Sequence, residues 1–143
     1  MTLENVRGFL ARHDKALRTL CRAGFAISVL TVCVLSLLPE DELPDTTLSD
    51  KVGHLIAYGE IVTIGLLAYR GPRAAYTVPL AILALGGALE IAQGFIPSRS
   101  ADMIDFAVNC AGVLIGIVFA RMLTRLWPAS RPITSFSERS LPR

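Results

Sequence analysis

The amino-acid sequence predicts an all-α integral membrane bundle of four transmembrane helices, with both chain termini in the cytoplasm. Two observations predict this class: 52% of the 143 residues are hydrophobic, and four long apolar runs follow one another with short connections. Each run is close to the roughly 20 residues that cross a hydrocarbon core about 30 Å thick. Core helices of a soluble domain this size are shorter and amphipathic, so the runs favour a membrane protein.

The four apolar runs are the predicted membrane spans, at residues 20–38, 52–69, 74–96 and 106–127. The first run follows a basic segment at residues 1–19 and has no small-residue cleavage site. We therefore expect it to be retained as a helix rather than removed as part of a signal peptide. Residues 20–127 form the predicted transmembrane domain. The tail at residues 128–143, which contains proline, serine and arginine, is expected to be disordered.

The distribution of basic residues predicts the orientation. Twelve of the 14 lysine and arginine residues lie before or at the start of the first run, between the second and third, or at the end of the fourth and beyond it. Only Lys51 and Arg99 lie in the other two connections. Because basic residues accumulate in cytoplasmic connections, both termini and the tail are predicted to be cytoplasmic. The opposite surface then faces outward and is acidic, through Glu40, Asp41, Glu42, Asp45, Asp50, Asp102 and Asp105.

Other features of the composition exclude several function classes. Cys21, Cys33 and Cys110 lie in or beside apolar runs without CxxC spacing. They therefore indicate small buried hydrophobes rather than a disulfide framework or a zinc site. The chain has no internal repeat, glycine-rich phosphate loop or basic–aromatic stripe, so nucleic acid is not an expected partner. The lipid bilayer is the partner that the apolar runs predict.

The most polar stretch within the apolar part of the chain is EIAQGFIPSRSADMIDFAVN, at residues 90–109. In the predicted topology it forms the outer end of the third span, a tight turn and the outer start of the fourth. Pro97 is expected to end the third helix, because the residue before a proline avoids helical geometry. Asp102 is expected to cap the fourth helix, with Asp105 in its first turn near the positive end of the dipole.

Helical spacing places polar residues and glycines on one face of each of the last three spans. Each face has its polar residues at the outer end, which predicts a tightly packed bundle with a polar cup opening outward. Gly112 and Gly116 form a small-xxx-small pair that allows a neighbouring helix to approach closely. The faces are Asp50, His54, Tyr58, Ile61 and Gly65; Leu83, Gly86, Gly87, Glu90 and Gly94, with Gln93 at the edge; and Asp105, Asn109, Gly112, Gly116 and Ala120.

Glu90 and Asn109 are the members of this cup that most need an explanation. Glu90 lies one to two turns below Pro97, where burial of a carboxylate is costly unless it is paired or protonated. If Glu90 has only a structural role, we expect its carboxylate to form a hydrogen bond with His54 or Asn109. A purely structural role, as a helix start, cap, dipole partner, interfacial histidine or lipid-phosphate contact, is also open for Asp50, Lys51, His54, Arg99, Asp102 and Asp105.

Glu60 is predicted to be separate from the cup. It lies near the middle of the second span, roughly 120° around the helix from the face of His54. We expect it to pair with Ser28 or Thr31 of the first span, or to face another subunit. A carboxylate within a membrane span commonly has a function. If Glu60 faces another subunit, the protein is a homo-oligomer, which is one of the alternatives.

The polar residues resemble the VanZ-like family of small bacterial membrane proteins. In that family a DK-x-x-H element precedes E-x-x-Q, a P-x-R turn, then D-x-x-x-N and a glycine. The elements occur here in the same order, at Asp50, Lys51, His54, Glu90, Gln93, Pro97, Arg99, Asp105, Asn109 and Gly112. The match covers the second to fourth spans. Two departures are Ser98, where the family often has glycine, and Glu60, where it is usually apolar.

The resemblance implies a VanZ-like four-helix domain at residues 20–127 in the bacterial plasma membrane. The founding member of that family is associated with low-level resistance to the glycopeptide antibiotic teicoplanin. The resemblance therefore links the chain to the cell envelope and, by resemblance alone, to antibiotic resistance.

Three functional hypotheses follow. The first is an outward site that binds a polar or amphiphilic envelope ligand, such as a lipid headgroup, a lipid-linked glycan or a glycopeptide. The second is a membrane enzyme acting on a lipid-linked envelope precursor, and the third is an oligomeric transport or assembly subunit. The predicted ligand-binding residues are Asp50, Lys51, His54, Glu90, Gln93, Arg99, Asp105 and Asn109.

The enzyme hypothesis has His54, Glu90 and Asp105 as its catalytic candidates, with His54 and Glu90 as a base and its orienting partner. The sequence contains no nucleophile motif. Two or three carboxylates with a histidine could also hold a divalent cation. Their spacing along the chain is discontinuous, so the sequence assigns no metal site and no cofactor.

Overall fold

The computed structural model describes residues 2–43, 49–96, 99 and 101–127. These residues form five α-helices and one short 3-10 helix, and no strand occurs among them. In chain order the elements are α1 (Leu3–Arg12), α2 (Asp14–Leu37), η1 (Glu40–Glu42), α3 (Asp50–Ala68), α4 (Ala74–Gln93) and α5 (Met103–Leu126). The predicted all-α class is confirmed. The tail at residues 128–143, for which disorder is the prediction, lies outside the described residues.

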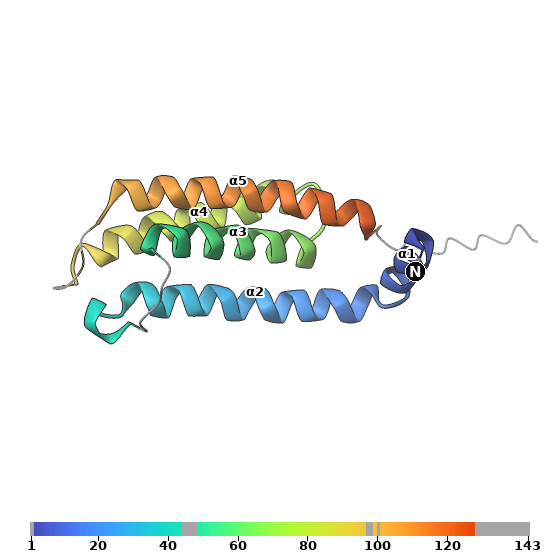
Figure 1. Ribbon diagram of the computed structural model, residues 1–143, viewed down its shortest axis with the longest axis horizontal. Helices are drawn as coiled ribbons and strands as arrows, with labels where there is room; N and C mark the ends of the chain where they lie inside the picture. The colour runs from blue at the N-terminus through green and yellow to red at the C-terminus, as the bar shows by residue number, and fades with distance from the viewer. Residues whose placement is uncertain (1, 44–48, 97–98, 100, 128–143) are drawn as a thin grey trace, which may run out of the picture.

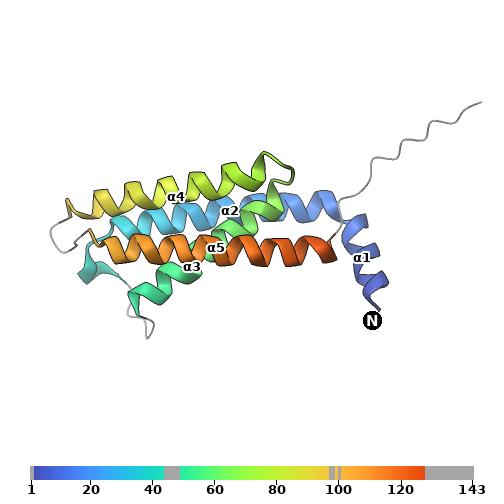
Figure 2. The same ribbon diagram turned by 90° about the horizontal axis from the view of Figure 1, so that it is seen from above.

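Helices α2 to α5 are each long and apolar enough to cross a membrane, so the chain is a multi-pass membrane protein. Figure 1 shows α3, α4 and α5 as one group with α2 along one side, and α1 lying across the end of the bundle. Seen from above, α3 crosses α5 at an angle (Figure 2). Because four helices cross in succession, the start of α2 and the end of α5 lie at the same end of the bundle, as the basic-residue pattern predicts.

The helix boundaries differ from the predicted spans by a few residues, and two of the differences have a visible cause. Helix α2 begins at Asp14, because this carboxylate lies in the first turn, near the positive end of the dipole, and pairs with Arg18 at 3.1 Å. Helix α4 ends at Gln93 rather than at residue 96. After Gly94, the N–H groups of Phe95 and Ile96 bond to carbonyls three residues back at 3.0 Å, which closes tight turns instead of continuing the helix. Pro97 lies outside the described residues, and Gly94, predicted on the α4 face, is exposed beyond the helix end.

Helix α1 is not among the predicted helices, because the N-terminal segment is short and polar. Thr2 caps it by accepting a hydrogen bond from the backbone N–H of Asn5 at 3.4 Å. Val6 and Leu10 on one face are half-buried, and Arg7 donates to the carbonyl of Arg125 at 3.2 Å. The basic segment at residues 1–19 thus contains α1 and the first residues of α2.

The tightest contact in the bundle joins α3 to α5 through glycines. A Cβ atom added at Gly116 would lie 2.5 Å from the carbonyl oxygen of Gly59, and one added at Gly112 would lie 2.7 Å from that of Leu55. The hydroxyl of Thr63 lies between the two backbones, 2.7 Å from the Gly59 oxygen and 3.2 Å from the Gly116 oxygen. The predicted small-xxx-small packing of α5 is confirmed, with α3 as its partner.

Around this contact lies a small apolar core made of Tyr58, Ile61, Val62, Ile82 and Val113. Lipid tails are as apolar as these side chains, so close packing rather than removal from water stabilises the core in a bilayer. The three cysteines are free, as predicted, but they are half-buried rather than buried.

The end of the bundle where α2 begins and α5 ends, called the basic end below, is held together by Arg70 and Trp127. Arg70 donates to the Trp127 carbonyl at 2.9 Å, and its guanidinium lies 4.1 Å from the centre of the Trp127 ring. The indole N–H donates to the buried carboxylate of Asp14 at 3.0 Å. Partial burial of Arg70, reinforced by repulsion from Arg18, lowers the pKa of its guanidinium. These contacts connect α2, the α3–α4 connection and α5.

Candidate functional site

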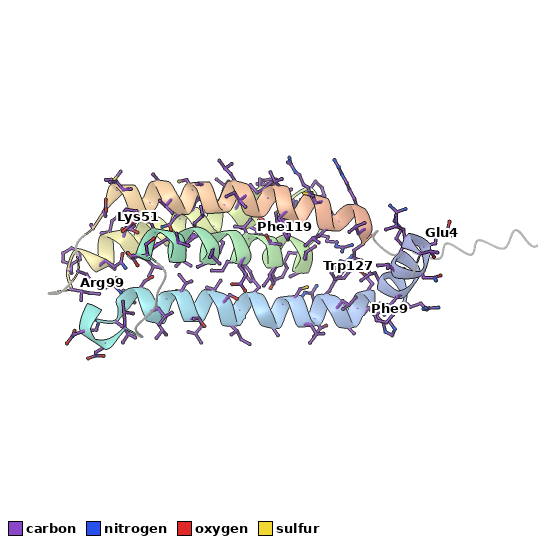
Figure 3. All side chains as sticks on the ribbon, viewed as in Figure 1. Glu4, Phe9, Lys51, Arg99, Phe119 and Trp127 are labelled. Carbon is purple, nitrogen blue, oxygen red and sulfur yellow. The ribbon has the colours of Figure 1, made fainter. Side chains whose placement is uncertain are left out.

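All of the predicted ligand-binding residues lie at the opposite end of the bundle, called the acidic end below. Helices α3 and α5 begin there, and α2 and α4 end there, which brings four helix termini together. Figure 3 shows Lys51 and Arg99 at this end and Trp127 at the other. The residues at the acidic end are Asp50, Lys51, His54, Glu90, Gln93, Arg99, Asp105 and Asn109.

A cavity of about 270 Å³ lies at the acidic end among α2, α3 and α4. Four of the predicted site residues line it: Asp50, His54, Gln93 and Arg99. Apolar side chains from α2, including Val32 and Leu35, and Ala57 and Tyr58 of α3 complete the wall. The α2 contribution is not predicted from sequence, since the uniformly apolar first span gives no indication of which face turns inward. The cavity therefore combines polar groups with an apolar surface.

His54 is the residue that joins the cavity to the interior of the bundle. Its Nδ1 lies 2.9 Å from the side-chain oxygen of Asn109, which is fully buried at 0% exposure. An amide oxygen only accepts hydrogen bonds, so Nδ1 is the donor in this contact, and in the neutral imidazole Nε2 then has a free lone pair. The Tyr58 ring lies nearly parallel to the imidazole, with 9° between the planes. The predicted meeting of His54 and Asn109 is confirmed.

Asn109 itself remains incompletely bonded. Its side-chain nitrogen is buried and has no hydrogen-bond partner among the described residues. Leaving such a donor unpaired costs about 1–3 kcal/mol. The oxygen of the Asn109 amide therefore orients His54, while the nitrogen of the same amide has no hydrogen bond to a described residue.

Lys51 connects the starts of α3 and α5. Its ammonium lies 3.0 Å from Asp105 Oδ1 and 3.3 Å from Asp102 Oδ2. Asp102 also caps α5, as predicted, by accepting the Ile104 N–H at 2.8 Å, and this bond together with Lys51 lowers the pKa of Asp102. The Lys51 side chain is 48% exposed, so solvent screening limits the contribution of these ion pairs to stability.

Glu90 is buried within the bundle, at 7% exposure, and does not face lipid. Its carboxylate accepts the backbone N–H of Asp102 at 3.4 Å, which ties the end of α4 to the start of α5. Within the described part of the chain, it forms no hydrogen bond with His54 or Asn109. The direct bond from Glu90 to one of these two residues, which is its structural interpretation from the sequence, is therefore absent from the described contacts, and the carboxylate accepts the Asp102 N–H instead.

Arg99 fastens the α4–α5 connection to the end of α2. Its Nε donates to the Leu38 carbonyl at 3.3 Å and its Nη2 to the Leu35 carbonyl at 3.2 Å. The last carbonyls of a helix lack partners within the helix and carry partial negative charge, so a guanidinium is favourable there. Two of its five N–H groups make these bonds, and the side chain also lines the cavity.

Glu60 lies outside this site, as predicted. Its carboxylate accepts a hydrogen bond from Ser28 of α2 at 3.1 Å, which confirms one of the two expected partners. The side chain remains exposed on the lipid-facing surface of the span. It therefore takes no part in the cavity at the acidic end.

The acidic end thus contains two connected sets of residues. One set lines the cavity, and the other, Lys51, Glu90, Asp105 and Asn109, lies beside it and positions helix ends or His54. No protein-family model, curated protein or solved structure matches this chain. The resemblance to the VanZ-like family is accordingly carried by the motif residues alone.

Proposed function

We propose that this chain is a VanZ-like protein of the bacterial plasma membrane whose acidic end faces outward and binds the polar part of an amphiphilic envelope ligand. A lipid headgroup or the head of a lipid-linked glycan is the class of ligand intended. The observation that carries the proposal is the cavity of about 270 Å³, which has polar lining residues at Asp50, His54, Gln93 and Arg99 and the apolar side chains of Val32 and Leu35 on α2. Its orientation rests on the basic residues at the other end of the bundle.

The polar lining suits a headgroup with both acceptor and donor groups. The N–H groups of Arg99 that are not bonded to α2 can donate to a phosphate or carboxylate oxygen. Asp50 can accept from a sugar hydroxyl or an amine, and the Gln93 amide can do either. Beside these groups, Val32 and Leu35 offer an apolar surface along which an acyl or prenyl chain can lie.

The size of the cavity restricts the ligand. Sites for drug-sized molecules have volumes of about 300–1,000 Å³, whereas this cavity has about 270 Å³. It therefore accommodates one headgroup or one end of a larger molecule, such as a glycopeptide. The connection to teicoplanin-type resistance follows from the resemblance, and expression of the chain in a susceptible host tests it.

The second candidate function is an enzyme acting on a lipid-linked precursor, and the lone pair of His54 Nε2 supports it. A general base needs such a lone pair within reach of its substrate. In this version Asn109 rather than Glu90 orients the imidazole, because Asn109 bonds to Nδ1. The third candidate, a transport or assembly subunit, has less support, since Glu60 pairs with Ser28 of the same chain.

Binding measured by native mass spectrometry in detergent separates these functions. The purified protein is incubated with phospholipids and with a lipid-linked glycan precursor. We expect a bound species that is weakened in Gln93→Leu, at normal membrane abundance, but unchanged in the matched polar-to-apolar variant Thr77→Val on α4 far from the cavity. Binding without a change of ligand mass supports the first function; a mass change lost in His54→Ala supports the enzyme. Equal binding by Gln93→Leu and the wild type contradicts the location of the site.

A further inference from the structure

Three groups that commonly bind metal ions come together beside the cavity. One ring nitrogen of His54 and one carboxylate oxygen from each of Asp50 and Asp105 all lie within 4.8 Å of one another. Asp50 and His54 are one turn apart on α3, and Asp105 comes from the first turn of α5. The set therefore exists only where these two helices meet.

The imidazole of His54 is oriented as in a metal site. A metal-binding histidine almost always donates its second ring N–H to a carbonyl or carboxylate, which fixes the tautomer and directs the other nitrogen to the ion. Asn109 supplies this acceptor at 2.9 Å from a position with 0% exposure. The buried amide nitrogen of Asn109 has no hydrogen-bond partner among the described residues. The contact with His54 is therefore the hydrogen bond that holds this amide in place.

The free nitrogen of His54 faces a carboxylate without a hydrogen bond. Nε2 lies 3.8 Å from Asp50 Oδ2, which is too long for a hydrogen bond. Two atoms with lone pairs that face each other at this separation both gain from a cation placed between them. The nitrogen and the oxygen then become two ligands of one ion.

The balance of charge around the site also favours a cation. Carboxylates outnumber basic side chains among the described residues that meet here, and Arg99 is directed to the α2 carbonyls. Lys51 is the ammonium that rests on Asp105, and it bonds only to Oδ1. Because Asp102 offers the same ammonium a second partner at 3.3 Å, Lys51 stays paired when Asp105 turns to an ion. The carboxylates are Asp50, Glu90, Asp102 and Asp105.

We propose that Asp50, His54 and Asp105 bind one first-row divalent cation of the Zn²⁺ type. One imidazole and two carboxylates leave at least one tetrahedral position open, as in metal sites that bind a substrate or water. Asp50 and His54 also line the cavity, so the open position adjoins the space for a headgroup. A bound cation would therefore add an attachment point for phosphate opposite Arg99. Cation binding itself requires no envelope ligand and can be measured without one.

Competition with a fluorescent zinc indicator tests the proposal on the full-length protein in nanodiscs of zwitterionic lipid, after treatment with a chelator. We expect one Zn²⁺ per chain, and an affinity reduced about tenfold or more by Asp50→Asn and by His54→Gln. The Asp50 side chain is 64% exposed, so its substitution leaves the fold intact. Asp41→Asn, at an exposed carboxylate on η1 of the same end, is the matched control and should keep wild-type affinity.

A second variant tests the geometry independently. Lys51→Met removes the ammonium that competes for Asp105, so we expect it to raise the affinity for Zn²⁺. Replacing Zn²⁺ with Co²⁺ should also give the visible absorption of a tetrahedral ion, lost in His54→Gln. The proposal is overturned by absence of stoichiometric Zn²⁺ binding, by equal losses in Asp50→Asn and Asp41→Asn, or by weaker binding in Lys51→Met. None of these results depends on whether the cavity binds a headgroup.

Discussion

Substitution of Gly116 by alanine tests the close approach of α3 and α5 most directly. The added Cβ atom would lie 2.5 Å from the carbonyl oxygen of Gly59. Ordinary carbon–oxygen contacts between helices are about 3.3–3.6 Å, so the helices must separate locally by about 0.8 Å, the difference between 3.3 Å and 2.5 Å. The contact is with backbone rather than with a flexible side chain, and no rotamer change relieves it.

The separation has a calculable cost. Forcing an extra methyl group into a close-packed contact typically costs about 1–3 kcal/mol. Helix propensity acts in the other direction, because alanine is favoured over glycine in a helix interior by about 1 kcal/mol. Gly24→Ala isolates that second effect, since the nearest atom to its added Cβ is Ile64 Cγ2 at an ordinary 3.8 Å. We expect Gly116→Ala to be less stable than Gly24→Ala by about 1–3 kcal/mol.

Reversible unfolding in bicelles, followed by circular dichroism, measures the free energy of unfolding of both variants. The hydroxyl of Thr63, 3.2 Å from the Gly116 oxygen, should lose that contact when the helices separate. Faster hydrogen exchange at the adjoining backbone amides of α3 would report this loss. Equal free energies of unfolding for Gly116→Ala and Gly24→Ala would refute the steric reasoning.

Three further predictions concern polar contacts. Trp127→Phe removes the indole N–H that bonds to Asp14, and we expect thermal unfolding in detergent to show a loss of about 1–3 kcal/mol; an unchanged transition would contradict it. Because the pKa of Asp102 is lowered, its carboxylate contributes to folding stability fully above the ordinary pKa of aspartate, and this contribution is lost as the pH falls through the lowered value. The loss of stability in acid should therefore be smaller in Asp102→Asn, whose amide still caps α5. Glu60→Gln keeps an acceptor for Ser28 and removes a charge from the lipid-facing surface, so unfolding in bilayers should require more free energy; a decrease would indicate that the charge itself is needed.

The sequence is sufficient to predict which face of α3 and of α5 turns inward, whereas on α4 the buried residues include Ile82 and Leu89, which lie beside the predicted face. The alternation of polar and small residues places His54 and Asn109 on facing surfaces, and their 2.9 Å contact confirms it. The same periodicity predicts the glycine contact of α5. These predictions succeed because a helix has a fixed angle per residue, so a face can be read from spacing alone.

Periodicity does not determine which residue on a neighbouring helix each side chain meets. Lys51 pairs with two aspartates of α5, and Arg99 reaches the end of α2, because crossing angles and connection geometry bring those elements together. For the same reason Glu90 accepts the Asp102 N–H rather than bonding to His54 or Asn109, the two partners that its structural interpretation named. The α2 wall of the cavity, which includes Val32, gives no periodic signal in a uniformly apolar span.

The pairing of α3 with α5 also sets the order in which this protein can mature during synthesis. Helix α3 is made before α5 and is separated from it in the chain by α4, so His54 and Gly59 enter the bilayer before their partners on α5 have been made. Asn109 and Gly116 arrive only with the last helix. A chain that stops after α4 would thus expose a hydrophilic half-site and a bare glycine groove, features by which membrane quality control can distinguish unfinished copies from finished ones.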